Sequence, residues 1–231
     1  MNKRILIAPL NWGLGHATRC IPIINALLEF NFEPVIASDG KALEFLKKEF
    51  PELEFIELPS YNISYSKKGS HLKLKLLKDA PKILKAIKTE HNIVQDLIVK
   101  NNIYGIISDN RFGVYSKKVP SVYITHQLNV LSGNTTFIST KLHQKTIKKF
   151  DECWVPDFKK NYSLSGVLGH SENPLIPTKY IGALSRFSKM SLQTKYDLMV
   201  LLSGPEPQRG LLEQKLFKEL LVFFSAILWY N

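Results

Sequence analysis

A loop near the start of the chain combines glycines with a histidine and an arginine. It has the sequence Asn-Trp-Gly-Leu-Gly-His-Ala-Thr-Arg over residues 11–19, between an apolar run and a helical pattern. Gly13 and Gly15 let the backbone approach a ligand closely, and the free N–H groups at a helix start favour an anion. We therefore expect a ligand-binding turn. The alternative is a tight structural turn in which a glycine takes a positive φ angle and His16 only caps the helix.

The same Gly-x-Gly spacing also allows a nicotinamide-dependent enzyme as a lesser hypothesis. Asp39 ends the second expected strand, where an acid that binds a ribose would lie. Against this hypothesis, Thr18 stands at the position of the third glycine, and Trp12 and His16 bring bulky side chains into the turn. A melting temperature that does not change with NAD or NADP would remove it.

Polar residues also follow two later strand-like runs. Ser-Asp-Asn-Arg-Phe-Gly occupies residues 108–113, and Ile-Thr-His-Gln-Leu occupies residues 124–128. In a doubly wound sheet, ligands bind outside the carboxyl ends of the strands, where both groups would lie. For Asp109 and Arg111 the alternative is an ion pair that stabilises a loop, and for His126 it is a buried structural histidine.

The elements around these residues predict an α/β fold with a Rossmann-like, doubly wound parallel sheet. Apolar runs alternate with helical patterns, as is typical of a parallel sheet covered on both faces. Strands are expected over residues 4–10, 34–38, 53–58, 105–108, 121–125 and 152–155. Helices are expected over residues 16–30, 42–50, 137–149 and 72–100, the last interrupted or restarted near Pro81.

The pattern divides the chain into a first domain over residues 1–172, a linker over 173–195 and the start of a second domain over 196–231. Pro174, Pro177 and Gly182 interrupt the linker, which has no long periodic run.

The second part is expected to form a strand over residues 197–202, a proline-rich loop and a helix over 208–221. One such βα unit cannot close a sheet. The apolar end, residues 220–230, is too short to span a bilayer. We interpret it as the product of truncation or a shifted reading frame, with a second strand or an interfacial anchor as alternatives.

The composition is that of an ordinary soluble protein, with 45% hydrophobic and 22% charged residues in 231. Cys20 and Cys153 lie far apart without metal-ligand spacing, so we expect reduced cysteines in a cytoplasmic chain. The first apolar run is too short for a signal peptide.

The formal charge of the chain is +11, and positive charge is concentrated between residues 61 and 100, which contain nine lysines and three acidic residues. The lysines are Lys67, Lys68, Lys73, Lys75, Lys78, Lys82, Lys85, Lys88 and Lys100, and the acidic residues are Asp79, Glu90 and Asp96. Such a segment suits anionic lipid or a phosphorylated substrate, or it is simply a solvated face. No nucleic-acid-binding motif accompanies it, so nucleic acid is not expected as a partner.

Three segments together resemble the two-domain (GT-B) glycosyltransferases, in particular the relatives of the UDP-N-acetylglucosamine transferase of peptidoglycan synthesis. Gly-Leu-Gly-His-Ala-Thr-Arg at 13–19 is similar to their first loop, and the Asp-Asn-Arg turn at 109–111 resembles one of theirs. Leu-Ser-Gly-Pro-Glu-Pro-Gln-Arg at 202–209 resembles the first donor-domain loop of a bacterial subgroup. Gly210 departs from that pattern, because a small β-branched or polar residue is more usual there.

The resemblance implies a set of site residues. His16 would be the general base or would orient the acceptor, and Asp109 would hold that base or an acceptor hydroxyl; an imidazole suits proton abstraction near neutral pH. Arg111 would pair with a phosphate. The acceptor-binding set is Gly13, Gly15, Arg19, Asn110, Arg111, His126 and Gln127. The donor-binding set is Ser203, Gly204, Pro205, Glu206, Gln208 and Arg209.

By this resemblance the chain is a hexosyltransferase or N-acetylhexosaminyltransferase that takes a nucleotide-sugar donor, expected to be a UDP-sugar, and a glycan or lipid-linked acceptor. No Asp-x-Asp motif is present, which agrees with an inverting reaction that needs neither metal nor cofactor. The lysine-rich segment would then contact the inner face of the cytoplasmic membrane. The alternative is a truncated, non-catalytic remnant or binding module, and we expect the isolated chain to bind sugar nucleotide weakly or not at all.

Overall fold

The computed structural model describes residues 3–61, 72–131, 133, 136–159, 162–193, 195–196, 198–202 and 206–228, with the backbone alone at 72–79, 138 and 222–228. It separates into two compact units: Met1–Ser64 with Lys73–Ser188, and Tyr65–Leu72 with Lys189–Asn231. Among the described residues, no helix combines the length and the apolar character needed to cross a membrane.

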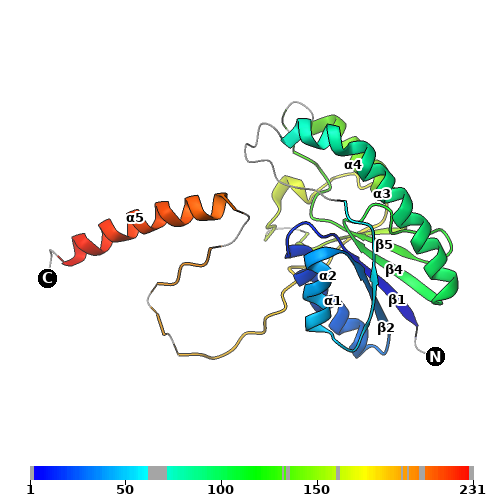
Figure 1. Cartoon of the computed structure of the whole chain (residues 1–231), viewed down its shortest axis with the longest axis horizontal. Coiled ribbons are helices and arrows are strands. Elements are labelled where there is room, and N and C mark those ends of the chain that lie inside the picture. Colours follow the sequence, from blue (N-terminus) through cyan, green and yellow to red (C-terminus); the bar gives the residue numbers. More distant parts are fainter. Residues whose placement is uncertain are drawn as a thin grey trace. The chain divides into compact units, whose positions relative to one another are not determined.

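The first unit is built on one seven-stranded sheet in which every pair of neighbours is parallel (Figure 1). The strand order is β3-β2-β1-β4-β5-β6-β7. The strands are β1 (Arg4–Pro9), β2 (Glu33–Ser38), β3 (Glu54–Glu57), β4 (Ile103–Asp109), β5 (Ser121–Ile124), β6 (Glu152–Val155) and β7 (Thr178–Tyr180). This order confirms the predicted α/β, Rossmann-like class.

Helices cover both faces of the sheet (Figure 1). They are α1 (Gly15–Glu29), α2 (Gly40–Glu49), α3 (Leu72–Lys100), α4 (Thr136–Ile147) and the short 3-10 helix η3 (Gly166–Leu168). Ile7 and Ile36 pack on the side of α1 and α2, whereas Leu6 and Val35 pack on the side of α3. Successive strand residues therefore enter opposite cores, as the two-residue period of a strand requires.

Two expectations about regular structure were wrong in the first unit. Thr178–Tyr180 lies inside the segment expected to be an irregular linker, yet it forms β7 and pairs with β6 through Val155 and Tyr180. The strand is only three residues long, too short for its periodicity to be seen. The helix α3 continues through Pro81 instead of being interrupted there. The proline side chain is exposed, and its missing N–H removes one helical hydrogen bond without ending the helix.

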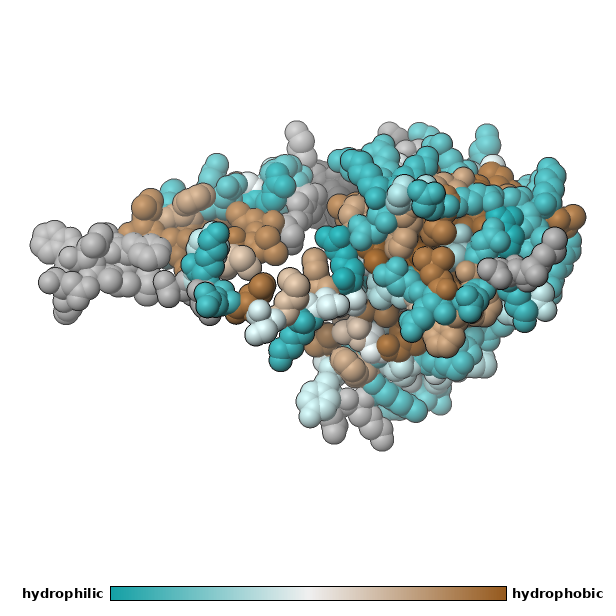
Figure 2. Space-filling view, turned by 90° about the horizontal axis from the view of Figure 1, so that it is seen from below, coloured by the Kyte–Doolittle hydropathy of each residue, from teal (hydrophilic) through white to brown (hydrophobic). Residues whose placement is uncertain are grey.

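The second unit contains one regular element, the helix α5 (Gln208–Leu228), among its described residues. The strand expected over residues 197–202 is not formed: residues 198–202 have no regular structure. A strand needs a partner to satisfy its backbone groups, and the described part of this unit offers none. Leu211, Leu212, Phe217 and Leu221 are exposed on α5, and Figure 2 shows brown, apolar side chains along this part of the helix. The division of the chain into acceptor-binding and donor-binding domains stays a prediction.

Candidate functional site

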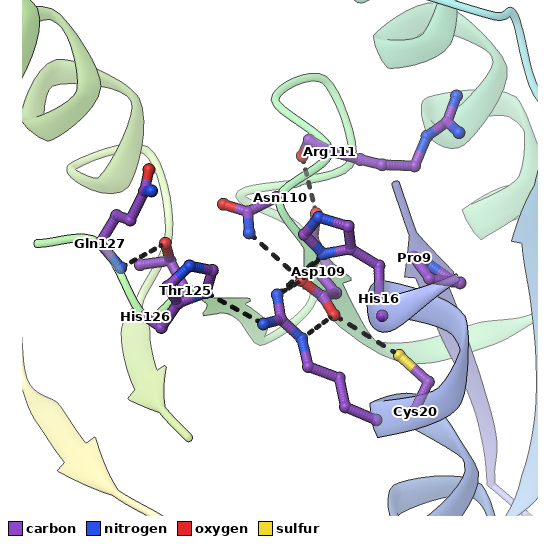
Figure 3. A network of polar contacts seen from close by, with 12 residues as sticks. Pro9, His16, Cys20, Asp109, Asn110, Arg111, Thr125, His126 and Gln127 are labelled. Carbon is purple, nitrogen blue, oxygen red and sulfur yellow. Dashed lines mark hydrogen bonds and ion pairs between the residues drawn. The ribbon is translucent and has the colours of Figure 1, made fainter. Parts of the chain in front are cut away.

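The carboxyl ends of β1, β4 and β5 bring most of the expected residues of the first unit together (Figure 3). The sheet order runs β2-β1-β4-β5, so the chain reverses its direction of winding between β1 and β4. Loops diverge at such a switch point and leave a crevice for ligands. His16 and Arg19 come from the first turns of α1, Asp109 ends β4, and His126 follows β5.

His16, Arg19 and Asp109 form the centre of this cluster. The Asp109 side chain is fully buried, whereas those of His16 and Arg19 are 13% and 14% exposed. His16 Nδ1 lies 2.9 Å from Asp109 Oδ1. Arg19 donates through Nε to Asp109 Oδ2 at 2.5 Å and through Nη2 to Oδ1. The carboxylate therefore contacts a histidine and, through two parallel bonds, an arginine.

Burial and charge oppose each other at this cluster. Burial alone would raise the pKa of Asp109, but the charge and hydrogen bonds of Arg19, together with the contact to His16, lower it below its ordinary value. Burial lowers the pKa of His126, and the neighbouring Arg19 and His16 lower it further. At neutral pH the site therefore holds an ionised Asp109 and a neutral His126.

Asn110 turns the chain directly after Asp109. Its φ angle of +57° lies in the left-handed region that asparagine tolerates better than most residues. Asn110 Oδ1 accepts a hydrogen bond from the Tyr123 hydroxyl at 3.0 Å, which fixes the turn to β5. As a result, Asp109 faces α1 while the Arg111 side chain points away from the cluster (Figure 3).

Arg111 is not brought into the cluster, although we expected it to bind a phosphate. Its side chain is 0% exposed and lies between Glu90, also 0% exposed, and Asp39. Arg111 Nη1 donates to Asp39 Oδ1 at 2.5 Å, Nε donates to Glu90 Oε1, and Nη2 donates to the carbonyl oxygen of Pro59 at 2.7 Å. The alternative, an ion pair between Asp109 and Arg111, is not formed either, because Arg111 pairs with Glu90 and Asp39 while Asp109 pairs with Arg19. Asp39 is engaged here as well, which weakens the nicotinamide hypothesis.

The glycines of the first loop have different roles. Gly13 has a φ angle of +77°, which other residues rarely adopt. Gly15 begins α1. A Cβ atom at either position would meet nothing within 4 Å. Glycine is therefore required at Gly13 by the backbone conformation and not by crowding.

Gln127 lies beside His126, and its backbone N–H donates to Thr125 Oγ1 at 3.1 Å.

A cleft of about 420 Å³ lies next to the cluster. Arg19 and His126 line one part of it, and the loops that follow β6 and β7 supply the rest: Pro156, Asp157, Leu164, Ser165, Leu168, Ala183 and Leu184. Most of these residues are apolar, so the cleft suits a ligand with an apolar portion next to a polar group. In the described part of the chain, no three His, Cys, Asp or Glu side chains are arranged to hold a metal ion.

Asp157 organises this cleft, and the sequence analysis did not identify it. Its carboxylate accepts hydrogen bonds from the backbone N–H groups of Phe158, Leu164 and Ser165 at 2.7, 2.9 and 2.9 Å. The hydroxyls of Ser163 and Ser165 also donate to it. The signal was present, because Pro156-Asp157 directly follows a strand just as Asp109 ends one.

When Asp157 is replaced with asparagine, the free energy of unfolding should fall less steeply as the pH is lowered into the acid range. Burial would raise the pKa of Asp157, but the hydrogen bonds it accepts lower it far below its ordinary value. The unfolded carboxyl, with a pKa of about 3.9, binds a proton more readily, so the stabilisation is complete above about pH 4 and is lost as pH falls below it. Urea unfolding of both proteins from about pH 6 downward should show a shallower acid decline for Asp157→Asn. Parallel curves would contradict this account.

The expected donor-binding residues fall in the second unit. Ser203, Gly204 and Pro205 lie outside the described residues. Gln208 and Arg209 begin α5, and Arg209 Nη2 pairs with Glu206 at 2.6 Å. Glu206 also accepts from the N–H of Gly210 at 3.2 Å. Glu206 therefore caps the start of α5, and Arg209 pairs with this capping carboxylate.

Comparison with known proteins gives structural matches alone. No family model matches the chain, and no curated protein matches it significantly. A UDP-glucosyltransferase from Polygonum tinctorium, capable of glucosylating indoxyl and solved with 3,4-dichloroaniline, matches with a TM-score of 0.53 at 11% identity, covering 84% of this chain and 56% of its own. UGT2 of Phytolacca americana matches with a TM-score of 0.53 at 12% identity, covering 81% of this chain and 53% of its own.

These matches establish a shared fold. The chain spans little more than half the length of either enzyme. The MurG structure from Acinetobacter baumannii also matches, but with a TM-score of 0.38 at 8% identity, covering 71% of this chain and 44% of its own. A likeness at that level carries no argument for a special relation to the peptidoglycan enzyme.

Proposed function

We propose that the chain forms the acceptor-binding part of a GT-B glycosyltransferase that uses a nucleotide-sugar donor. The observation that carries the proposal is the contact between His16 Nδ1 and the buried Asp109 carboxylate, at the switch point of the sheet and beside a cleft. The fold shared with plant UDP-glucosyltransferases supports the class of reaction.

In the proposed reaction, an acceptor hydroxyl loses its proton to His16 Nε2 while its oxygen attacks the anomeric carbon of the sugar. The bond from that carbon to the nucleoside diphosphate breaks, and the diphosphate leaves with the electron pair. Asp109 orients the imidazole through Nδ1 and stabilises the imidazolium that forms. A hexosyl or N-acetylhexosaminyl group from a UDP-sugar is our proposed donor portion. The loop that contains Ser203, Gly204 and Pro205 and the start of α5 would bind the diphosphate.

Turnover tests this proposal directly. The chain is incubated with UDP-, GDP- and dTDP-sugars and a set of glycan, lipid-linked and small apolar hydroxyl acceptors, and the released nucleotide is measured. Because we expect the isolated chain to bind sugar nucleotide weakly, the donor is supplied in large excess, and we expect slow release with a UDP-sugar that depends on the acceptor. A chain that shows a thermal shift with an acceptor but releases no nucleotide is a binding module, the alternative function, and the catalytic proposal fails.

Contact with an anionic membrane remains part of the proposal. Lys82, Lys85 and Lys88 are exposed on α3. Of the earlier lysines, Lys67 and Lys68 lie outside the described residues, and Lys73, Lys75 and Lys78 are described by their backbone alone. A lysine near an anionic surface contributes about 1 kcal/mol, so a triple Lys→Gln change at 82, 85 and 88 should weaken binding to phosphatidylserine vesicles about 100-fold in a flotation assay.

The chain offers a matched control for this assay. Lys41, Lys47 and Lys48 are also exposed, on α2, and their replacement with glutamine removes the same charge from another helix. The same loss in both triple variants would show a general effect of net charge instead of a binding face. Equal flotation with neutral and anionic vesicles would remove the membrane from the proposed partners.

A further inference from the structure

His16 Nδ1 has two close partners that require opposite proton positions. Asp109 Oδ1 lies 2.9 Å away and can only accept, so it favours a proton on Nδ1. Arg19 Nη2 lies 2.8 Å away and can only donate, because a guanidinium does not lose its proton in proteins. It therefore favours a bare Nδ1 and a proton on Nε2. A neutral imidazole can satisfy one of these partners at a time.

The balance between these partners favours Arg19. The guanidinium binds both oxygens of Asp109 and largely neutralises the carboxylate that would otherwise attract an N–H group. An Nδ1–H group would also face a full positive charge at van der Waals distance or closer, in a site where His16 is 13% exposed and poorly screened. A bare Nδ1 accepts a hydrogen bond from that cation instead.

His126 meets the same arginine in the same way. Arg19 Nη1 lies 3.1 Å from His126 Nδ1, and since the guanidinium only donates, this nitrogen accepts and the ring proton lies on Nε2. Burial and the adjacent charge of Arg19 lower the pKa of His126, so the ring is neutral when it accepts. The Arg19 side chain thus contacts the Nδ1 atoms of two histidines and the carboxylate of Asp109.

We propose that Arg19 is a positioning residue that sets the tautomer of His16, keeping the proton on Nε2 as long as the guanidinium binds Asp109. This inference rests on the proposed role of His16, because a proton on Nε2 prevents that nitrogen from acting as a base. A ligand group in the cleft that Arg19 lines could displace Arg19 from Asp109. Asp109 Oδ1 would then be free to accept a hydrogen bond from His16 Nδ1. The proton would then move to Nδ1 and leave a lone pair on Nε2.

Nitrogen NMR on the ligand-free chain tests the assignment without any need for turnover. The six histidines are labelled with 15N, the ring signals of His16 are assigned by their loss in His16→Gln, and spectra are recorded at about pH 9, where imidazoles are neutral. We expect Nε2–H as the major tautomer of His16 in the unchanged protein. Arg19→Met keeps an unbranched side chain, similar to the aliphatic part of arginine, but has no charge and no hydrogen-bond donor. In this variant we expect Nδ1–H to become the major form.

Arg4→Met is the matched control, because Arg4 lies on β1 and pairs with Glu33 and Glu54 instead of the cluster. It should leave the His16 ring signals unchanged. An unchanged protein with its His16 proton on Nδ1, or a folded Arg19→Met with an unchanged His16 tautomer, would overturn the proposal. If Arg19→Met does not fold, the spectrum of the unchanged protein decides alone. A chain that releases no nucleotide would refute the proposed function but would not alter this result.

Discussion

Replacement of Glu90 with alanine is expected to lower the free energy of unfolding by about 3–5 kcal/mol, the range for breaking a buried ion pair by removing one partner. Glu90 and Arg111 are both 0% exposed. Glu90 Oε2 also accepts from the Tyr61 hydroxyl at 2.5 Å and from the N–H of Gly113 at 2.9 Å. Without the carboxylate, a buried cation keeps one acidic partner, Asp39, and two buried donors lose theirs. Urea unfolding at neutral pH measures the loss.

Glu33→Ala provides the comparison for this result. Glu33 pairs with Arg4 at 3.0 Å, but its side chain is 50% exposed, so its removal should cost less than about 1 kcal/mol. Glu90→Gln keeps the shape and one acceptor oxygen, and we expect an intermediate loss. If Glu90→Ala and Glu33→Ala cost the same, then the Arg111 network does not stabilise the fold, and the burial of Arg111 needs another explanation.

The class of the fold could be predicted because every long element has a strong periodic signal. Residues 4–9, 33–38 and 103–109 form buried parallel strands, and their apolar runs differ clearly from the amphipathic helices between them. Two short or isolated segments could not be predicted. The strand β7 depends on pairing with β6, and residues 198–202 look like a strand but have no partner in the part of the chain that is described. Pairing between distant segments decides both cases, and local pattern does not show it.

The candidate site was predictable in its location and less so in its contacts. Strand ends indicated that His16, Asp109 and His126 would lie on one edge of the sheet, and the structure brings them together. The same reasoning placed Arg111 there, because it does not predict the direction of a side chain after a turn. Asn110, with its positive φ angle, turns Arg111 toward Glu90 on α3, 21 residues earlier in the chain. A buried acid within a lysine-rich helix looks like one more surface charge in the sequence.

Replacement of His16 with alanine is expected to lower kcat/KM for glycosyl transfer by about 10²–10⁴-fold, the usual contribution of a positioned general base. The donor and acceptor for the assay are the pair that the turnover panel identifies. If the acceptor also binds in the cleft, as we propose, its KM should change much less than kcat. Asp109→Asn should cause a loss in the same direction, since an amide cannot stabilise the imidazolium as a carboxylate does.

His91→Ala separates loss of the base from general damage. His91 is half-buried on α3, and its Nδ1 lies 3.1 Å from the carbonyl oxygen of Gly113, which places it among structural contacts outside the cluster. We expect less than about a tenfold change in kcat/KM for this variant. A comparable loss in His16→Ala and His91→Ala would mean that both act through stability. If His16→Ala raises KM and leaves kcat unchanged, His16 orients the acceptor, and the base would have to come from another group.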